Sequence, residues 1–177
     1  LKRFKLVDLA FGNTLCEPDR RLRYAYFPLT GIISLMAPAI GHPPLEMGLI
    51  GNEGMLDATI VLGTSTARLH AIVHRSGTAL RLSITQLRQE LVGSIPLRRM
   101  MSRYLYVLLV QLSQTAACAR FHEVEARLAR WLLLTHDRAH SDHFHLTHQY
   151  LAGMLGVQRS AITIAAGALQ RKKLIHY

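Results

Sequence analysis

One stretch near the end of the chain, LTHQYLAGMLGVQRSAITIAAGAL, constrains the fold more than any other. It places Gly156 in the middle of an otherwise apolar, helix-favouring run. Two helices can cross steeply over a short turn only where one residue accepts a left-handed backbone, which glycine does without a steric penalty. We therefore expect a helix from the N-cap Thr147 through Leu155, a turn at Gly156 and a second helix after it.

The residue types around this turn match the burial pattern of a helix-turn-helix. Ala152 stands where the two helices approach most closely and only a small side chain fits. A plain pair of packed helices is the alternative, but it needs neither the small residue nor the glycine at these offsets. The apolar residues that such a unit would bury are Leu151, Leu155, Val157, Ile162 and Ala165.

Subtraction of the buried set leaves residues that face outward and predict contact with double-stranded DNA. Arg159 can donate two hydrogen bonds to guanine, and Ile164 can contact a thymine methyl group. The start of the first helix can bind phosphate through side chains and free amides. For each residue alone, a solvated surface position is the alternative. The predicted DNA-binding residues are Thr147, His148, Gln149, Gln158, Arg159, Ser160, Thr163 and Ile164.

The composition agrees with a polyanionic partner. The 177-residue chain has a formal net charge of +10, which favours nucleic acid. Cys16 and Cys118 are too few for a disulfide framework or a four-cysteine metal site, and they favour a reducing cytoplasm. No apolar stretch approaches the roughly 18 residues that cross a bilayer, so we expect no membrane partner.

The first half of the chain is typical of short antiparallel strands. Residues 24–36 hold two β-prone runs joined by a Pro-Leu-Thr-Gly turn, and further strand signals lie at 45–51, 69–74 and 78–82. Such strands predict a small barrel or sandwich. Ser83 and Gln86 have the spacing of a capping box, which predicts a short helix after the last strand.

A long helix is predicted next, because Ser94 and Pro96 suit a first helical turn and no glycine or proline follows until Gly153. Within it, apolar and small residues recur at steps of four and three, the spacing of a coiled-coil seam. We expect this stripe to form a homodimer interface, and a core helix packed on its own barrel is the alternative. The stripe consists of Met101, Leu105, Leu108, Leu112, Thr115 and Ala119.

Taken together, these features resemble the Crp/Fnr superfamily of bacterial transcription regulators over essentially the whole chain. The resemblance rests on YFPLTGIISLM, LIGNEGM, CARFHEVEARLARWLL and LTHQYLAGMLGVQRSAI. It implies an α+β fold with an antiparallel, cyclic-nucleotide-binding-like β-roll over residues 1–92, a dimerisation helix over 93–121 and a winged helix-turn-helix over 122–177. The wing would follow KKLIHY, so we expect the chain to stop at its edge and to lack both natural ends.

The chain departs from the best-known members of that family at its effector and DNA-reading positions. Members that bind cyclic nucleotides carry an Arg-Ser pair, whereas Arg68 is followed by Leu69. Ser160 and Ile164 stand where a glutamate and a second arginine occur in those members, so the operator sequence is not predicted. The cysteine cluster of iron-sulfur members is missing, and we expect no cofactor. The candidate effector pocket consists of Glu46, Glu53 and Arg68.

The resemblance implies a cytoplasmic homodimer that presents two recognition helices to half-sites about one helical turn apart on a pseudo-palindromic operator. Its further partners would be RNA polymerase and a small-molecule effector of unknown identity. An effector would act by shifting the hinge between the long helix and the DNA-binding unit, near Phe121.

A small metal-dependent barrel enzyme or a metal sensor is the alternative function. His136 and His140, four residues apart, could bind zinc or nickel, but a polar connector between helices is the favoured explanation because no ligand set of fixed geometry is evident. A barrel enzyme would use His42, His70 and His74 together with Glu46. We expect no enzyme, because the chain has no nucleophile elbow, P-loop or dinucleotide-binding motif.

Overall fold

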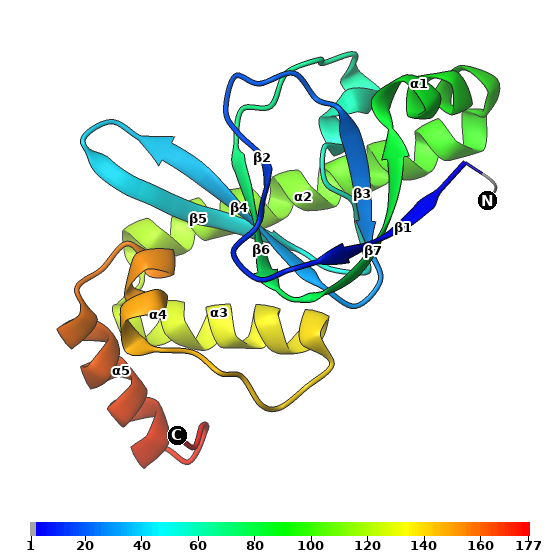
Figure 1. Cartoon of the computed structure of the whole chain (residues 1–177). Coiled ribbons are helices and arrows are strands. Elements are labelled where there is room, and N and C mark those ends of the chain that lie inside the picture. The colour runs from blue at the N-terminus through cyan, green and yellow to red at the C-terminus, as the bar shows by residue number, and fades with distance from the viewer. Residues whose placement is uncertain (1–2) are drawn as a thin grey trace.

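The β-rich first half of the chain forms two antiparallel sheets in the computed structural model, which describes residues 3–177 (Figure 1). One sheet has the order β1-β7-β3 and the other β2-β6-β4-β5. The two sheets enclose an apolar core that includes Ile33, Leu35, Ile50 and Val73. The strands are β1 (Lys5–Leu9), β2 (Thr14–Cys16), β3 (Tyr24–Pro28), β4 (Ile32–Ala39), β5 (His42–Ile50), β6 (His70–Arg75) and β7 (Gly77–Ser83).

The helices follow the order that the sequence predicts. The Ser83–Gln86 capping box is present and starts α1, and the Ser94 side chain caps α2 by accepting a hydrogen bond from the Leu97 amide. A short 3-10 helix, η1 (Ala58–Leu62), lies between β5 and β6. No helix in the described part of the chain is long and apolar enough to span a membrane. The α-helices are α1 (Ile84–Gly93), α2 (Ile95–Phe121), α3 (Val124–Ala139), α4 (His148–Leu155) and α5 (Arg159–Arg171).

The long helix α2 turns most of the predicted dimer stripe toward its own β-roll, which is the packing that the sequence analysis gave as the alternative. The β-roll and α3 both lie against this side of α2, so Met101 and Leu108 are buried within the chain, whereas Ala119 stays exposed. Residues that pack into the β-roll clusters are Met101, Leu105, Leu108 and Leu112, and those that line a small cavity beside α3 are Thr115 and Ala119.

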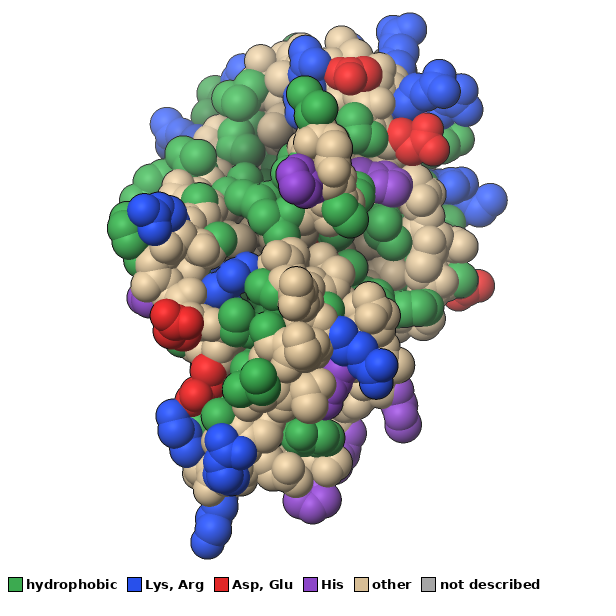
Figure 2. Space-filling view, turned by 90° about the vertical axis from the view of Figure 1, so that its left-hand side faces the viewer, with side chains coloured by type: hydrophobic (Ala, Val, Ile, Leu, Met, Phe, Trp, Pro, Cys, Tyr) green, Lys and Arg blue, Asp and Glu red, His purple; other side chains and the backbone are tan. Residues whose placement is uncertain are grey.

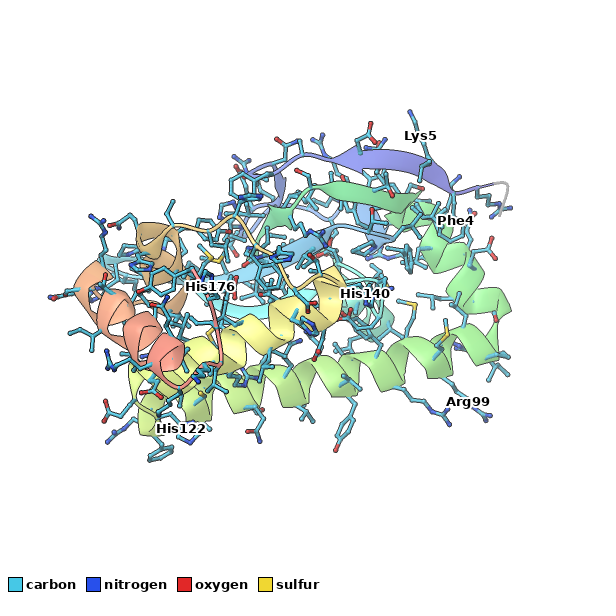
Figure 3. The ribbon with its side chains drawn as sticks, turned by 90° about the horizontal axis from the view of Figure 1, so that it is seen from below. Phe4, Lys5, Arg99, His122, His140 and His176 are labelled. Atoms are coloured by element: carbon cyan, nitrogen blue, oxygen red, sulfur yellow. The ribbon has the colours of Figure 1, made fainter. Side chains whose placement is uncertain are left out.

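The opposite face of α2 is exposed and also apolar. In Figure 3 this helix runs along the edge of the molecule with one side free. Val107 and Leu109 are 56% and 60% exposed, and the exposed set also contains Met100, Tyr106, Val110 and Phe121. An α-helix that is apolar on two sides has one side left for a partner after the chain has folded.

A buried carboxylate joins the β-roll to the unit formed by α3, α4 and α5. Glu46 on β5 is 7% exposed and accepts hydrogen bonds from the Ser34 hydroxyl at 2.5 Å and from the Trp131 indole of α3 at 2.6 Å. Beside it, the His74 ring of β6 packs edge-on against Trp131 and stacks on Tyr150 of α4, with 2.7 Å between His74 Nδ1 and the Tyr150 hydroxyl. The side chains of three strands and two helices therefore share one polar cluster.

Further contacts reinforce this junction at both ends. Arg75 Nη1 donates to the carbonyl of Ala139 at the end of α3 at 2.5 Å, and the Arg138 guanidinium of α3 pairs with the Glu53 carboxylate at 2.8 Å. The β4–β5 hairpin reaches over α4, where Leu45 lies against Gly156 (Figure 1). The β-roll thus fixes where α4 and α5 stand relative to α2.

Burial shifts the two titratable groups of this cluster in opposite directions. Desolvation raises the pKa of Glu46 to about 7, although the hydrogen bonds from Ser34 and Trp131 favour the charged form. Desolvation lowers the pKa of His74 to about 4. Both side chains are therefore neutral in the folded protein at mildly acidic pH. Between pH 4.5 and pH 6.5, the ordinary pKa values of the two groups, their effects on the free energy of unfolding oppose each other.

We predict that Glu46→Gln removes the carboxyl contribution to the pH dependence of stability and leaves the opposing contribution of His74. A raised carboxyl pKa stabilises the folded state below pH 4.5, and this contribution is lost as pH rises through 7. The free energy of unfolding of the wild type relative to Glu46→Gln should therefore fall by about 3 kcal/mol over that range, at roughly 1.4 kcal/mol per pKa unit. Urea unfolding, followed by the emission of the single tryptophan Trp131, measures it.

His74→Gln serves as the matched control, because its sign is reversed. A lowered imidazole pKa stabilises the folded state above pH 6.5, and the contribution is lost as pH falls through about 4. The wild type should accordingly lose stability relative to His74→Gln on acidification. Parallel pH profiles for the two variants would contradict the opposite shifts.

Candidate nucleic-acid interface

The turn between α4 and α5 has the backbone that the sequence predicts. Gly156 has φ 62° and ψ 42°, a left-handed conformation, and it ends α4. The amide of Val157 donates to the carbonyl of Ala152 at 3.0 Å, which closes the turn. The Arg127 guanidinium of α3 donates to the last carbonyl of α4, that of Leu155. The last turn of α4 is thus held from both the turn and α3.

The apolar side of this unit is buried as expected. Leu151, Ala152, Leu155, Ile162 and Ala165 are all buried, and Val157 packs against them at partial exposure. Leu128 and Trp131 of α3 complete the same cluster. Three helices therefore enclose one core, as in a helix-turn-helix and unlike a bare helical hairpin.

The residues predicted to face outward on α5 do so. Gln158, Arg159, Ser160 and Thr163 are exposed, and Ile164 is 71% exposed. Figure 2 views the side of the molecule on which α5 lies, and Lys and Arg side chains project from the lower part of this face.

The five exposed residues Gln158, Arg159, Ser160, Thr163 and Ile164 are called the exposed row below. The start of α4 lies beside them. Thr147 caps the helix, since its hydroxyl accepts a hydrogen bond from the Tyr150 amide at 3.1 Å. His148 Nδ1 lies 3.0 Å from the Thr163 hydroxyl oxygen, so the start of α4 is tied to the middle of α5. Gln149 is exposed. The eight predicted DNA-binding residues thus share the exposed side formed by the start of α4 and the first two turns of α5.

The three residues of the candidate effector pocket are not brought together. Glu46 is buried against Trp131, and Glu53 binds Arg138 and the Gly51 amide. Arg68 is exposed and pairs with Asp19 at 2.7 Å. The two glutamates therefore hold the helical unit in place, a role that sequence reasoning missed because their partners lie about 85 residues away in the chain.

The histidines do not converge on one site. The Asp142 carboxylate lies 2.9 Å from His136 Nε2 and raises the pKa of that imidazole, with a smaller effect from Asp137, whereas His140 lies beside Asn52. Figure 3 shows His122, His140 and His176 well apart. Within residues 3–177 no group of three or more His, Cys, Asp or Glu side chains could hold a metal ion.

The proposed barrel site also fails on geometry. His74 and Glu46 are buried side chains, with His74 Nδ1 2.7 Å from the Tyr150 hydroxyl and the Glu46 carboxylate bonded to Ser34 and Trp131. His70 Nε2 lies 3.3 Å from the Thr14 hydroxyl at the edge of its sheet. The metal-dependent alternative therefore has no site among the described residues.

Comparison with known proteins agrees with this geometry. Residues 126–177 match the Crp-like helix-turn-helix domain. No curated protein sequence matches the chain. The resemblance to Crp/Fnr regulators inferred from the sequence is thereby confirmed for the helix-turn-helix domain.

Solved structures of bacterial regulators share the fold over nearly the whole chain. CLP of Xanthomonas campestris, a c-di-GMP-responsive global regulator, is 16% identical with a TM-score of 0.78, over 99% of this chain and 91% of that chain. FixK2 from Bradyrhizobium japonicum is 11% identical with a TM-score of 0.80, over 98% and 88%. A CRP/FNR family transcriptional regulator from Thermus thermophilus is 19% identical with a TM-score of 0.74, over 98% and 89%.

We predict that Gly156→Ala destabilises the protein by about 1 to 2 kcal/mol, the cost of a left-handed backbone with a Cβ atom. The new Cβ would also lie 2.7 Å from Leu45 Cδ1, which must move. Gly153→Ala is the control, because Gly153 is helical with open space around it and the change should stabilise α4 by roughly 0.5 to 1 kcal/mol. Urea unfolding of the two variants tests this, and changes of the same sign would contradict it.

Proposed function

We propose that this chain is a sequence-specific DNA-binding transcription regulator that acts as a homodimer on a pseudo-palindromic operator. It has the fold of CRP/FNR family regulators and a Crp-like helix-turn-helix domain. The observation that carries the proposal is the exposed row on α5, which begins directly after the left-handed turn at Gly156. Action on chromosomal DNA would place the protein in the cytoplasm.

The residues of the row suit distinct tasks at a duplex. Arg159 can donate two hydrogen bonds to the O6 and N7 atoms of guanine in the major groove, and Gln158 or Ser160 can bond a base edge or a phosphate. The first-turn amides of α4 point out of its N-terminus, where a phosphate is favoured by the helix dipole. The formal charge of +10 supports association with a polyanion.

The exposed face of α2 supports assembly with a second copy. Met100, Val107 and Phe121 fall on one heptad position, and Val110 falls on the position that alternates with it. The same two positions also hold Arg103, Gln114 and Ala117, so the apolar contact would centre on Val107 and Val110. We therefore place the dimer interface on this face, in place of the stripe that the sequence predicted.

The β-roll is proposed as a sensor domain without an assigned effector. Its hydrogen bonds to Trp131, Tyr150 and Ala139 give it a means to set the orientation of the DNA-binding unit about the break between α2 and α3. A ligand that binds one orientation better than another would shift DNA affinity by that difference. RNA polymerase is proposed as a partner at promoters, and no residue is assigned to it.

Selection from a random duplex pool tests the DNA-binding proposal. The wild type should enrich two half-sites whose centres lie about one helical turn apart. Arg159→Ala should cost about 1 to 3 kcal/mol of binding and relax the preference at one base pair in each half-site. Arg171→Ala, at the far end of α5, is the matched control and should leave base preference unchanged. Equal selectivity of the wild type and Arg159→Ala would contradict the assigned role.

Sedimentation equilibrium tests the dimer interface. Val107→Glu places two like charges across a two-fold axis and should raise the dimer dissociation constant at least tenfold, on the order of the cost of facing like charges at an interface. Ile40→Glu, at the fully exposed tip of the β4–β5 hairpin, is the control and should leave the dimer intact. A Val107→Glu protein that remains as dimeric as the control would place the interface elsewhere.

A further inference from the structure

The side chain of Thr163 lies in the middle of the exposed row on α5, but its hydroxyl is turned toward protein atoms. It donates to the carbonyl of Arg159, one turn earlier, at 3.2 Å. The same oxygen lies 3.0 Å from Nδ1 of His148 at the start of α4. Thr163 is nevertheless exposed. Its polar atom therefore has two protein neighbours while part of the side chain still faces outward.

A threonine hydroxyl has one proton. That proton is used within the protein in either tautomer of His148, because it bonds either the Arg159 carbonyl or the imidazole nitrogen. The hydroxyl is then a poor donor for a base edge. The group of Thr163 that remains without a polar partner is its methyl, and a methyl recognises the C5-methyl of thymine by apolar contact.

His148 is itself held in place. Its ring packs edge-on against the Tyr177 ring with 5.3 Å between centroids, and the side chain is half-buried. It lies at the first position of α4, directly after the Thr147 cap, so the imidazole moves with the helix start. The bond to Thr163 thus joins two well-defined elements and fixes the rotamer of an exposed side chain.

We infer that Thr163 reads a thymine through its methyl group, and that His148 is a positioning residue that keeps the Thr163 hydroxyl turned away from the groove. The inference rests on the proposed function and names a specificity within it. Ile164, the next residue, presents a second apolar group on the same exposed row. The chain would then favour half-sites with two thymine methyl groups in reach, beside the guanine read by Arg159.

The methyl of each thymine can be removed without any other change by substituting deoxyuridine. In the duplex selected by the wild type, each dT of a half-site is replaced in turn by dU and the affinity is measured. We expect one dU position to weaken the wild type about fourfold, the ratio that burial of one methyl-sized group corresponds to. The same position should be insensitive in Thr163→Ser, which keeps the hydroxyl and loses the methyl.

Thr163→Val is the complementary variant, since it keeps a methyl in place and removes the hydroxyl. It should retain the affinity and the dU sensitivity of the wild type within about twofold. Loss of that sensitivity in Thr163→Val, or its retention in Thr163→Ser, would overturn the inference. Circular dichroism of both variants verifies that these exposed substitutions leave the fold intact.

The role of His148 is tested by a double-mutant cycle. His148→Ala should reduce the dU sensitivity when residue 163 is threonine and leave it unchanged in the Thr163→Val background, where no hydroxyl has to be held. A merely structural role for His148 would lower the sensitivity equally in both backgrounds and would overturn the positioning role. If the wild type selects no sequence, the proposed function and this inference are overturned together. If the dU sensitivity is lost in Thr163→Val or retained in Thr163→Ser, the inference alone is overturned.

Discussion

The left-handed backbone at Gly156 sets the angle between α4 and α5, and the whole exposed row depends on this angle. With an ordinary right-handed residue at this place, α4 would continue and Arg159 would follow it along one axis. The turn instead lets Leu151, Leu155 and Ile162 meet in one core with Leu128. Burial of these side chains then leaves the polar positions of α5 outside. Local backbone geometry thus decides which side chains of α5 form the exposed surface.

A second constraint acts between the β-roll and the helical unit. The contact is made by four polar side chains and not by two apolar surfaces. They are the Glu46 carboxylate, the His74 imidazole, the Trp131 indole and the Tyr150 phenol. Buried polar groups of this kind hold one geometry strictly, because any displacement leaves a donor or acceptor unpaired. Glu46 and His74 are also both neutral when buried, so the junction carries no buried net charge at mildly acidic pH. The orientation of α4 and α5 is therefore well defined relative to α2.

The sequence was sufficient to predict the parts of the fold whose causes are local. Gly156, Ala152 and the apolar positions around them predicted the helix-turn-helix, and the Ser83–Gln86 spacing predicted the start of α1. Which side of α2 packs on the β-roll was beyond local prediction, because α2 is apolar on two sides and periodicity does not say which side the β-roll covers. Leu108 is buried while Val107 next to it is exposed, and only the folded chain decides between them.

The contacts of the two glutamates were beyond prediction for a related reason. Glu46 and Glu53 meet Trp131 and Arg138 from a distant part of the chain, and no local pattern connects a strand residue to a helix so far along the sequence. The exposed residues predicted to contact DNA on α5, in contrast, followed from subtraction once the buried set was known. Which of their atoms are free to meet DNA needed the structure, as the engaged hydroxyl of Thr163 shows.

The most direct measurement of the central claim is a hydroxyl-radical footprint of the wild-type protein on a duplex that it has selected. Two recognition helices related by a two-fold axis should protect two segments on one side of the duplex, with centres about 34 Å apart. The protection should weaken steeply as salt is raised, because phosphate contacts release counterions. Uniform cleavage at low salt, or a single protected segment at saturating protein, would contradict the account of a dimer that reads DNA through α5.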